Sequence, residues 1–423
     1  MAAYKGIEYL RRKQQQRQER VKTRYKYYEM KMKRMDPSPI IPTEMKEAYN
    51  TVLGWCTRAV DCLADRLHFL GIEEDGDILM MDDIFRVNNP DILFDNAILS
   101  ALIGSCSFLY IIPQGPEETP RIQVLDGRNA TGEIDQTTGL LTEGYAVLER
   151  DDDNETVLIE AYFTAGRIEI REKGVKTPKI IKNAANYPLL VPVIHRPDAA
   201  RPFGHSRITR ACMNLQDKAR HTMTRADVSA EFYSFPQRYV LGLDEDAEHF
   251  DNWKQTVKTM LDFRAGENGD KVTVGQFAQQ SMDPHINQLK LYASAFAGET
   301  GMTLDDMGFP SENPSSSEAI KAAHENLRLA SRKAQRNFGT GFMNAGFLAA
   351  CVRDNETYDR EVLAEARCKW APIFEPDLTA ISLIGDGIQK LAQAAPGYIG
   401  WDNLQGLTGI EKSKDPFEVK SIG

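Results

Sequence analysis

The chain has 423 residues, 42% of them apolar and 26% charged, which is typical of a soluble globular protein of two or three domains. Its net charge of −10 argues against a protein that grips nucleic acid with its whole surface. The six cysteines include no C-x-x-C pair, which fits a reducing compartment and neither a disulfide framework nor a zinc ribbon. There is no secretory signal, and the most apolar run, 97–112, is too short and too interrupted for a membrane span, so we expect a cytoplasmic protein.

The first 36 residues are predicted to form a basic helical arm. Residues 1–35 hold 12 Lys or Arg and three Glu, a local charge of +9 that leaves −19 for the rest of the chain. The arm has two interpretations. It is a solvated helix whose tyrosines Tyr25, Tyr27 and Tyr28 pack onto the next segment, or it contacts phosphate or an acidic partner.

The segment after the arm is predicted to begin with two helices and a strand. Apolar residues at helical spacing predict a helix over 43–70, and a second helix over 88–104 has Pro90 in its first turn. Residues 107–112 form a continuous apolar run, which predicts a buried strand.

Between 121 and 195 the apolar period changes to two, which predicts half-buried strands joined by hairpin turns at 151–154 and 165–166. Asp151, Asp152 and Asp153 are adjacent carboxylates, and at a hairpin tip we interpret them as solvated turn residues rather than a metal site.

Two further helices are predicted over 206–232 and 283–300. They enclose an insert with a strand at 237–243, a helix at 245–263 and a strand at 271–277.

The strongest helical pattern covers 315–353. Its apolar residues recur in steps of three and four, beside a basic stripe of Lys321, Arg328, Arg332 and Arg336. The S-x-x-E spacing at the start predicts a capped helix, and Gly339 and Gly341 predict a bend. A last clear helix is predicted over 378–394 and a final helical turn over 401–407.

No motif for catalysis, cofactor binding or metal binding is present. The chain lacks a phosphate-binding G-x-x-x-x-G-K-[ST] loop and a G-x-S-x-G elbow, and its seven histidines never show ligand spacing. The sequence therefore predicts no enzyme, no cofactor and no metal. The basic stripes are either solvated faces or, in a ring of copies, the lining of a passage for a polyanion.

Four segments carry a resemblance to a known family: RPFGHSR at 201–207, LQDKARHTMTRADVSAEFYSFPQRYVLG at 215–242, TLDDMGF at 303–309 and NPSSSEAIKAAHENL at 313–327. In combination they resemble the portal (connector) proteins of tailed bacteriophages, over about residues 25 to 410. The resemblance implies a ring, usually of twelve copies, at one capsid vertex, through which double-stranded DNA enters and leaves.

The resemblance also implies a mixed α+β fold with a helix and β-meander wing, long stem helices, a small αβ clip and a helical crown. Carried over by position, these parts are the basic N-terminal arm (1–36), the wing (37–200), the first stem helix (201–232), the clip (233–280), the second stem helix (281–302), the tunnel loop (303–317), the long kinked helix with its return to the wing (315–370), and a reduced crown with the C-terminal tail (371–423).

The expected functional residues fall into three groups. The tip of the tunnel loop is expected at Glu312, Asn313, Pro314, Ser315, Ser316 and Ser317. The basic residues expected to face the channel or a neighbouring subunit are Lys321, Arg328, Arg332, Arg336, Arg207, Arg210 and Lys218. The helix kink is expected at Gly339 and Gly341.

The partners implied are other copies of the chain, the DNA in the channel, the large terminase, the head–tail adaptor, and the major capsid and scaffolding proteins, with no membrane. The location implied is the virion, after assembly in the host cytoplasm. Alternatives from other classes are an adaptor or minor capsid protein, a terminase or nuclease of the packaging machine, and a DNA-binding regulator with a basic arm. The missing phosphate loop and the paired long helices favour the portal.

Overall fold

The computed structural model describes residues 4–33, 51–74, 76, 78–115, 118–151, 156–234, 238–241, 273–276, 281–310, 317–374, 378–400 and 404. The chain divides into two compact units. The first unit comprises Met1–Glu29, Cys56–Thr209 and Ser315–Gly423, and the second comprises Met30–Trp55 and Arg210–Pro314.

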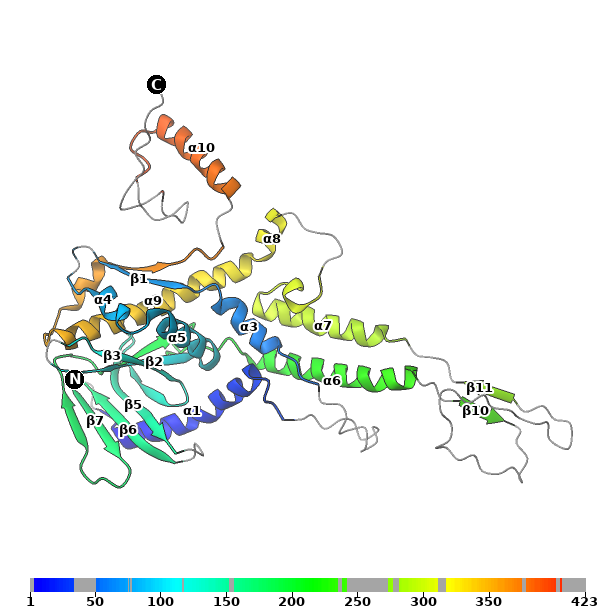
Figure 1. The fold of residues 1–423 in the computed structure, drawn as a ribbon, viewed down its shortest axis with the longest axis horizontal. Coiled ribbons are helices and arrows are strands. Elements are labelled where there is room, and N and C mark those ends of the chain that lie inside the picture. The colour runs from blue at the N-terminus through cyan, green and yellow to red at the C-terminus, as the bar shows by residue number, and fades with distance from the viewer. Residues whose placement is uncertain are drawn as a thin grey trace. The chain divides into compact units, whose positions relative to one another are not determined.

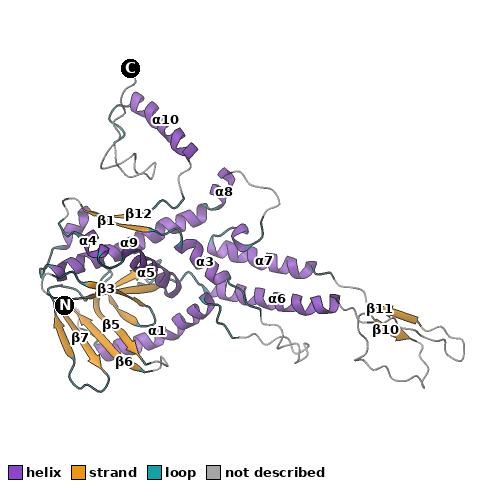
Figure 2. Cartoon of the chain, viewed as in Figure 1, coloured by secondary structure: helices purple, strands orange, loops and turns teal. Residues whose placement is uncertain are grey.

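The first unit contains most of the described elements (Figures 1 and 2). Its helices are α1 (Ile7–Tyr28), α3 (Trp55–Ala64, whose first residue counts with the second unit), α4 (Met81–Arg86), α5 (Pro90–Gly104), α8 (Ser317–Ala323), α9 (Glu325–Arg353), the 3₁₀ helix η2 (Arg360–Glu365) and α10 (Leu378–Ala394). Its strands are β1 (Phe69–Glu74), β2 (Cys106–Ile112), β3 (Arg121–Asp126), β4 (Ala130–Ile134), β5 (Leu141–Arg150), β6 (Val157–Thr164), β7 (Arg167–Glu172), β8 (Lys179–Lys182), β9 (Leu190–Ile194) and β12 (Ala366–Trp370).

These strands form three antiparallel sheets. Strands β4 to β8 make a five-stranded meander in sequence order, β3, β2 and β9 make a three-stranded sheet, and β1 pairs with β12. The meander confirms the strands predicted from alternation, and the buried strand β2 confirms the strand predicted from the apolar run at 107–112. Gly166, at φ +68°, supplies the left-handed residue of the β6–β7 turn, as expected for the 165–166 hairpin.

The basic arm is an integral part of the first unit. Helix α1 packs on strands β4 and β5 and on α5, and Leu10 is buried with Tyr145 and Val147. Lys13 and Lys5 pair with Glu133 at 2.5 and 3.1 Å. The arm is therefore packed on the sheet rather than simply solvated. Its tyrosines do anchor it, since Tyr28 donates to Asp61 at 3.0 Å and Arg128 lies over the Tyr25 ring.

One predicted helix is wrong at both described ends, because α3 covers only Trp55–Ala64 and residues 51–54 are not helical. The helix expected over 43–70 ends at Ala64, and residues 69–74 form strand β1 instead. The cause is non-local, because β1 pairs with β12 in a register that sets Phe69 opposite Trp370, and their rings lie 4.8 Å apart. A pairing partner some three hundred residues away leaves no local periodic signal. Residues 43–50 lie outside the described part of the chain.

The long helix is also divided differently from the prediction. The interruption lies at His324, between α8 and α9, and α9 runs without a break through Gly339 and Gly341. A Cβ on Gly339 would lie 2.9 Å from Cys368 Sγ, and one on Gly341 would lie 3.2 Å from the Pro192 carbonyl oxygen. These glycines therefore let strands β12 and β9 approach the helix closely.

The second unit is a helix pair with a small strand pair. It contains α6 (Arg210–Ser234), β10 (Arg238–Leu241), β11 (Thr273–Gln276), α7 (Asp283–Thr300) and the 3₁₀ helix η1 (Asp305–Met307). Helices α6 and α7 pack side by side, with bonds from Thr222 to Gln288 at 3.3 Å and between Ser229 and His285 at 3.2 Å (Figure 1). Strands β10 and β11 match the strands predicted in the insert, and its expected helix at 245–263 lies outside the described residues.

Candidate functional site

Helix α9 has two distinct halves. In its C-terminal half nearly every residue from Phe338 to Val352 is buried, and Phe342 lies 4.8 Å from Phe69 and 4.7 Å from Phe94. In its N-terminal half only Leu327, Ser331 and Ala334 are buried, which are spaced to lie on one side of a helix. The first half is therefore available for contacts outside the fold, and the second belongs to the core.

The opposite side of that N-terminal half is basic and exposed. Arg332, Lys333 and Arg336 are exposed there, and none of the three forms an ion pair within the part of the chain that the structure describes. We call these three residues the α9 basic face. Leu329, 53% exposed, lies among them. Such a cluster of exposed cations is either a solvated face or a surface that attracts an anionic partner.

The two remaining residues of the predicted stripe behave differently. Arg328 is half-buried and holds Glu325 with two bonds of 2.6 Å, so its charge is answered within its own helix. This hydrogen-bonded pair raises the pKa of Arg328 and lowers that of Glu325. Lys321 is exposed on the short helix α8, beyond the break at His324.

Helix α6 carries a second polar face in the other unit. Arg210 and Lys218 are both exposed and share one side of the helix with His221 and Arg225. A cavity of about 240 Å³ opens along this side toward Gln288 and Tyr292 of α7. Burial and the nearby Arg225 charge lower the pKa of His221, so that ring is neutral at pH 7.

The structure removes Arg207 from the candidate set. Its side chain is 8% exposed, and its Nε donates to the Ala59 carbonyl oxygen of α3 at 3.1 Å. The guanidinium is buried in the first unit and hydrogen-bonds to the α3 backbone, an acceptor that sequence spacing does not reveal. Residues 201–209, expected at the start of the stem helix, belong with the first unit.

The RPFGHSR segment is held in the first unit by packing and hydrogen bonds. Phe203 is buried beneath the Arg17 guanidinium, which lies 4.1 Å from the ring centroid. Ser206 donates to the Ile103 carbonyl oxygen at 2.7 Å, and the His205 carbonyl accepts from Nδ1 of the buried His195 at 2.7 Å. The sequence marked these residues as a family signature, and the structure gives them a packing role.

The expected tip of the tunnel loop falls largely outside the described residues. Glu312, Asn313, Pro314, Ser315 and Ser316 are not described, and Ser317 begins α8. Before the gap, Gly308 caps η1 in the left-handed conformation and Thr303 donates to the Asp306 carboxylate at 2.9 Å. The loop's position therefore remains a prediction.

Two absences apply to the described part of the chain. No group of three or more His, Cys, Asp or Glu gathers there in a way that could hold a metal ion. None of the helices described there has the length and apolar composition that crossing a lipid bilayer requires.

Comparison with known proteins identifies the class. Residues 7–372 match the family described as "Phage portal protein, SPP1 Gp6-like". The chain belongs to this phage portal protein family, a family of structural rather than enzymatic proteins.

Two curated relatives agree with this assignment. The portal protein of Mycobacterium phage L5 is 23% identical over 71% of this chain, and that of Mycobacterium phage D29 is 24% identical over 76%. The match covers 65% and 69% of those relatives, so the chain spans about two thirds of their length.

Solved structures with a similar backbone come from gene transfer agent particles. One is the neck of the native particle, 15% identical, covering 85% of this chain and 90% of that one at a TM-score of 0.42. Another is the virion of the native particle, 13% identical, with the same coverages and a TM-score of 0.46.

Proposed function

We propose that the protein assembles as a ring, of twelve copies in the simplest form, that serves as the DNA channel at one vertex of a phage capsid. Membership of the portal family over residues 7–372 is the observation that carries this proposal. In this role the chain is not an enzyme, and the energy for DNA movement comes from a separate large terminase docked on the clip, 233–280. The ring is assembled in the host cytoplasm and retained in the virion.

In the ring, the exposed cations of the helices meet DNA or the neighbouring copy. The α9 basic face, Lys321 of α8, and Arg210 and Lys218 of α6 are all exposed, whereas Arg207 is buried and Arg328 is paired. Net charge supports a channel through which DNA slides. A chain of charge −10 with separated cations makes few lasting phosphate contacts, and each lasting contact would add salt-dependent affinity.

The remaining parts take the roles of the family layout. Residues 303–317 form the tunnel loop that narrows the channel, 37–200 the wing, and 371–423 a reduced crown. The head–tail adaptor, the major capsid protein and the scaffolding protein are the other partners of such a ring.

Images of the purified protein test this proposal. Negative-stain electron microscopy is expected to show end-on rings. Mass photometry is expected to give them a mass close to twelve times the 47.6 kDa of one chain. Only monomers or dimers, at concentrations and salt where portal relatives form rings, would overturn it.

A further inference from the structure

The cavity between helices α6 and α7 of the second unit has a lining without a single aliphatic side chain among the described residues. It measures about 240 Å³, less than the roughly 300–1,000 Å³ typical of small-molecule pockets, so it has room for one polar group rather than for a whole ligand. Its lining residues are Asn214, Asp217, Lys218, His221, Thr222, Arg225, Gln288 and Tyr292. We call this cavity the α6–α7 groove.

A relay of hydrogen bonds leaves one donor free at the groove. The buried Thr222 hydroxyl donates to the Gln288 side-chain oxygen at 3.3 Å, and the Gln288 amide donates to the Tyr292 hydroxyl oxygen at 3.1 Å. Because the Tyr292 oxygen accepts this bond, its own proton points away from Gln288 and is available for another acceptor. No described residue of the chain supplies that acceptor.

The charged side chains of the groove add two free cations. Asp217, the one carboxylate among the described lining residues, lies 3.6 Å from the guanidinium of the buried Arg220. Lys218 and Arg225 are exposed, and within the described residues neither forms an ion pair or a hydrogen bond. Together with the Tyr292 hydroxyl they present donors from two helices to one small space.

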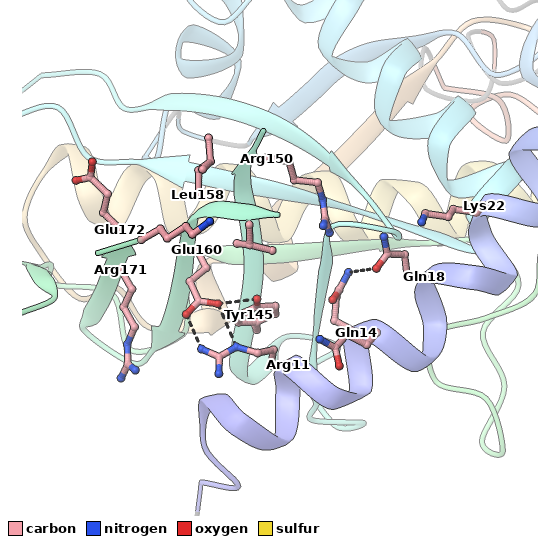
Figure 3. Close-up of a pocket in the computed structure, with 13 residues that line it drawn as sticks. Arg11, Gln14, Gln18, Lys22, Tyr145, Arg150, Leu158, Glu160, Arg171 and Glu172 are labelled. Carbon is pink, nitrogen blue, oxygen red and sulfur yellow. Dashed lines mark hydrogen bonds and ion pairs between the residues drawn. The ribbon is translucent and has the colours of Figure 1, made fainter. Parts of the chain in front are cut away.

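The larger cavity, of about 510 Å³ between α1 and the meander, shows how such donors are satisfied inside the chain. There Arg11 binds both carboxylate oxygens of Glu160, at 2.6 and 3.2 Å, and the Tyr145 hydroxyl donates to the same carboxylate at 2.8 Å (Figure 3). In the α6–α7 groove no described carboxylate takes this place, which indicates an anionic group from outside.

The lining favours a phosphate of DNA over an acidic segment of a protein. Protein interfaces have an apolar centre, whereas protein–DNA interfaces are more polar and positively charged and direct at least half of their hydrogen bonds to the backbone. A groove without an aliphatic wall fits the second kind. Arg210 is exposed on the same side of α6, about 12 Å before Lys218, and gives a second contact that a chain of phosphates can use and a free phosphate ion cannot.

We propose that the α6–α7 groove binds one backbone phosphate of duplex DNA, with Lys218, Arg225 and the Tyr292 hydroxyl as donors. The inference rests on the proposed ring, in which DNA passes along the assembled copies, and it gives that DNA a defined contact. A backbone contact is independent of base sequence, as the passage of a whole genome requires. Both cations stay exposed, so the contact is weakened by salt and exchanges as the DNA slides.

His221 couples this contact to pH. It lies three residues after Lys218 and four before Arg225, on the same side of α6, and the other titratable groups of the lining are Asp217 and Tyr292. Burial and the Arg225 charge lower the pKa of the imidazole. A bound phosphate offsets the Arg225 charge and favours the protonated imidazole, which donates from both nitrogens. DNA binding therefore takes up a proton, and its affinity rises as the pH falls.

Titration of purified rings with a fluorescein-labelled duplex of about 30 base pairs tests the cations of the groove. Lys218→Ala/Arg225→Ala is compared with Lys176→Ala/Lys179→Ala, which removes the same charge from exposed lysines of the other unit. Fluorescence anisotropy is expected to show an affinity about tenfold lower, with a shallower salt dependence, in the groove variant alone. Circular dichroism verifies that each variant folds, and Lys218→Gln/Arg225→Gln replaces the pair if the alanine variant does not.

Tyr292→Phe tests the geometry of the groove, because it removes a donor without changing the charge. It is expected to weaken DNA binding severalfold, whereas Tyr4→Phe, at an exposed tyrosine of the first unit, leaves binding unchanged. A loss of affinity confined to the charge variant would show a general electrostatic attraction in place of a built site, and would overturn the proposal.

The pH dependence of DNA binding tests the proton. Wild-type rings are expected to bind the duplex more tightly at pH 6 than at pH 7, and His221→Gln should lose most of this gain. An equal gain in both proteins would overturn the place of His221 in the site.

Mass photometry separates the remaining outcomes. Rings of normal mass whose DNA affinity matches the control overturn the groove alone. Groove variants that fail to form rings where the control forms them would show that an acidic segment of a neighbouring copy occupies the groove, which also overturns the proposal. Wild-type protein that forms no ring overturns the proposed function, and the same titration of the unassembled chain then decides on the groove.

Discussion

At the scale of single residues, backbone geometry decides what the RPFGHSR segment tolerates. Gly204 has φ +69°, and a Cβ there would lie 2.1 Å from the His195 carbonyl oxygen, a backbone atom that cannot rotate away. Gly174 has a similar φ of +86° but has open space around it. The two glycines therefore separate the cost of a left-handed backbone from the cost of a collision.

We expect Gly204→Ala to lower the free energy of unfolding by about 3 kcal/mol or more, since the carbonyl or the turn must move. Gly174→Ala, which meets only the unfavourable φ, should cost about 1 kcal/mol. Urea denaturation followed by circular dichroism measures both values. Equal losses at the two sites would show that the close approach at Gly204 is relieved without cost.

The buried histidine beside Gly204 gives the protein an acid-sensitive point. Burial lowers the pKa of His195 to about 3 in the folded protein, so its imidazole stays neutral there. In the unfolded chain the imidazole has a pKa near 6.5 and takes up a proton as the pH falls. Stability from this residue is therefore fully present above pH 6.5 and is lost as the pH falls toward 3. Between pH 7 and pH 5 the loss is about 2 kcal/mol.

Replacing His195 should remove this pH dependence of the free energy of unfolding. His195→Gln should be less stable than wild type at pH 7, yet lose about 2 kcal/mol less between pH 7 and pH 5. Denaturant midpoints at the two pH values measure the difference, with His324→Gln as the control. If the free energy of unfolding depends on pH equally in wild type and His195→Gln, the His195 imidazole is not a neutral buried group.

At the scale of elements, some helices and strands follow from local sequence pattern, whereas others depend on contacts with distant parts of the chain. Helices α5 and α7 were predictable because each has apolar residues at helical spacing and a proline in its first turn, and the meander strands because their apolar residues follow a period of two. Strand β1 was not, since its strand state depends on β12, and the burial of Arg207 was not, since its acceptor is a carbonyl of α3. The basic stripe of α9 was predictable from spacing, but the pairing of Arg328 was not, since it depends on the position of Glu325.

The glycines of α9 give a test of close packing against helix bending. Gly341→Ala should destabilise the protein by about 1–3 kcal/mol, because its Cβ would meet Val193 at 3.1 Å and the Pro192 carbonyl at 3.2 Å. Gly298→Ala, inside α7 with open space around it, should instead stabilise its helix by up to about 1 kcal/mol. Thermal unfolding of both variants checks the pair, and stabilisation by Gly341→Ala would mean that close approach is not the reason for that glycine.

We expect the α9 basic face to contribute to assembly or DNA transport rather than to folding. Arg332→Ala/Arg336→Ala should change the free energy of unfolding by less than about 0.5 kcal/mol, since both side chains are exposed and outside any described ion pair. The same variant should reduce ring formation or packaged DNA in a defined packaging assay. Arg353→Ala, whose side chain binds Asp354 at 2.7 Å at the far end of the helix, is the control. Normal assembly and packaging in the Arg332→Ala/Arg336→Ala variant would remove this face from the channel and from the subunit interface.

At the scale of the whole molecule, the proposed channel must admit DNA without holding it. The total charge of −10 opposes tight binding, while exposed cations on α6, α8 and α9 supply separated contacts. The family layout assigns the narrowing of the proposed channel to residues 303–317. These residues include η1 and end at the first residue of α8.

Deletion of Glu312–Pro314 tests that assignment at the level of the assembled particle. The three residues lie between the Gly308 cap of η1 and the start of α8, so removing them shortens a connection without deleting any described helix or strand. We expect rings of normal mass and thermal stability, together with a severalfold loss of packaged DNA, because the loop acts on the DNA rather than on the subunit contacts. Replacing the same residues with Gly-Ser-Gly separates the loss of length from the loss of side chains. Packaging at the wild-type level in both variants would place the narrowing elsewhere, and failure of both to fold would make the segment part of the fold instead.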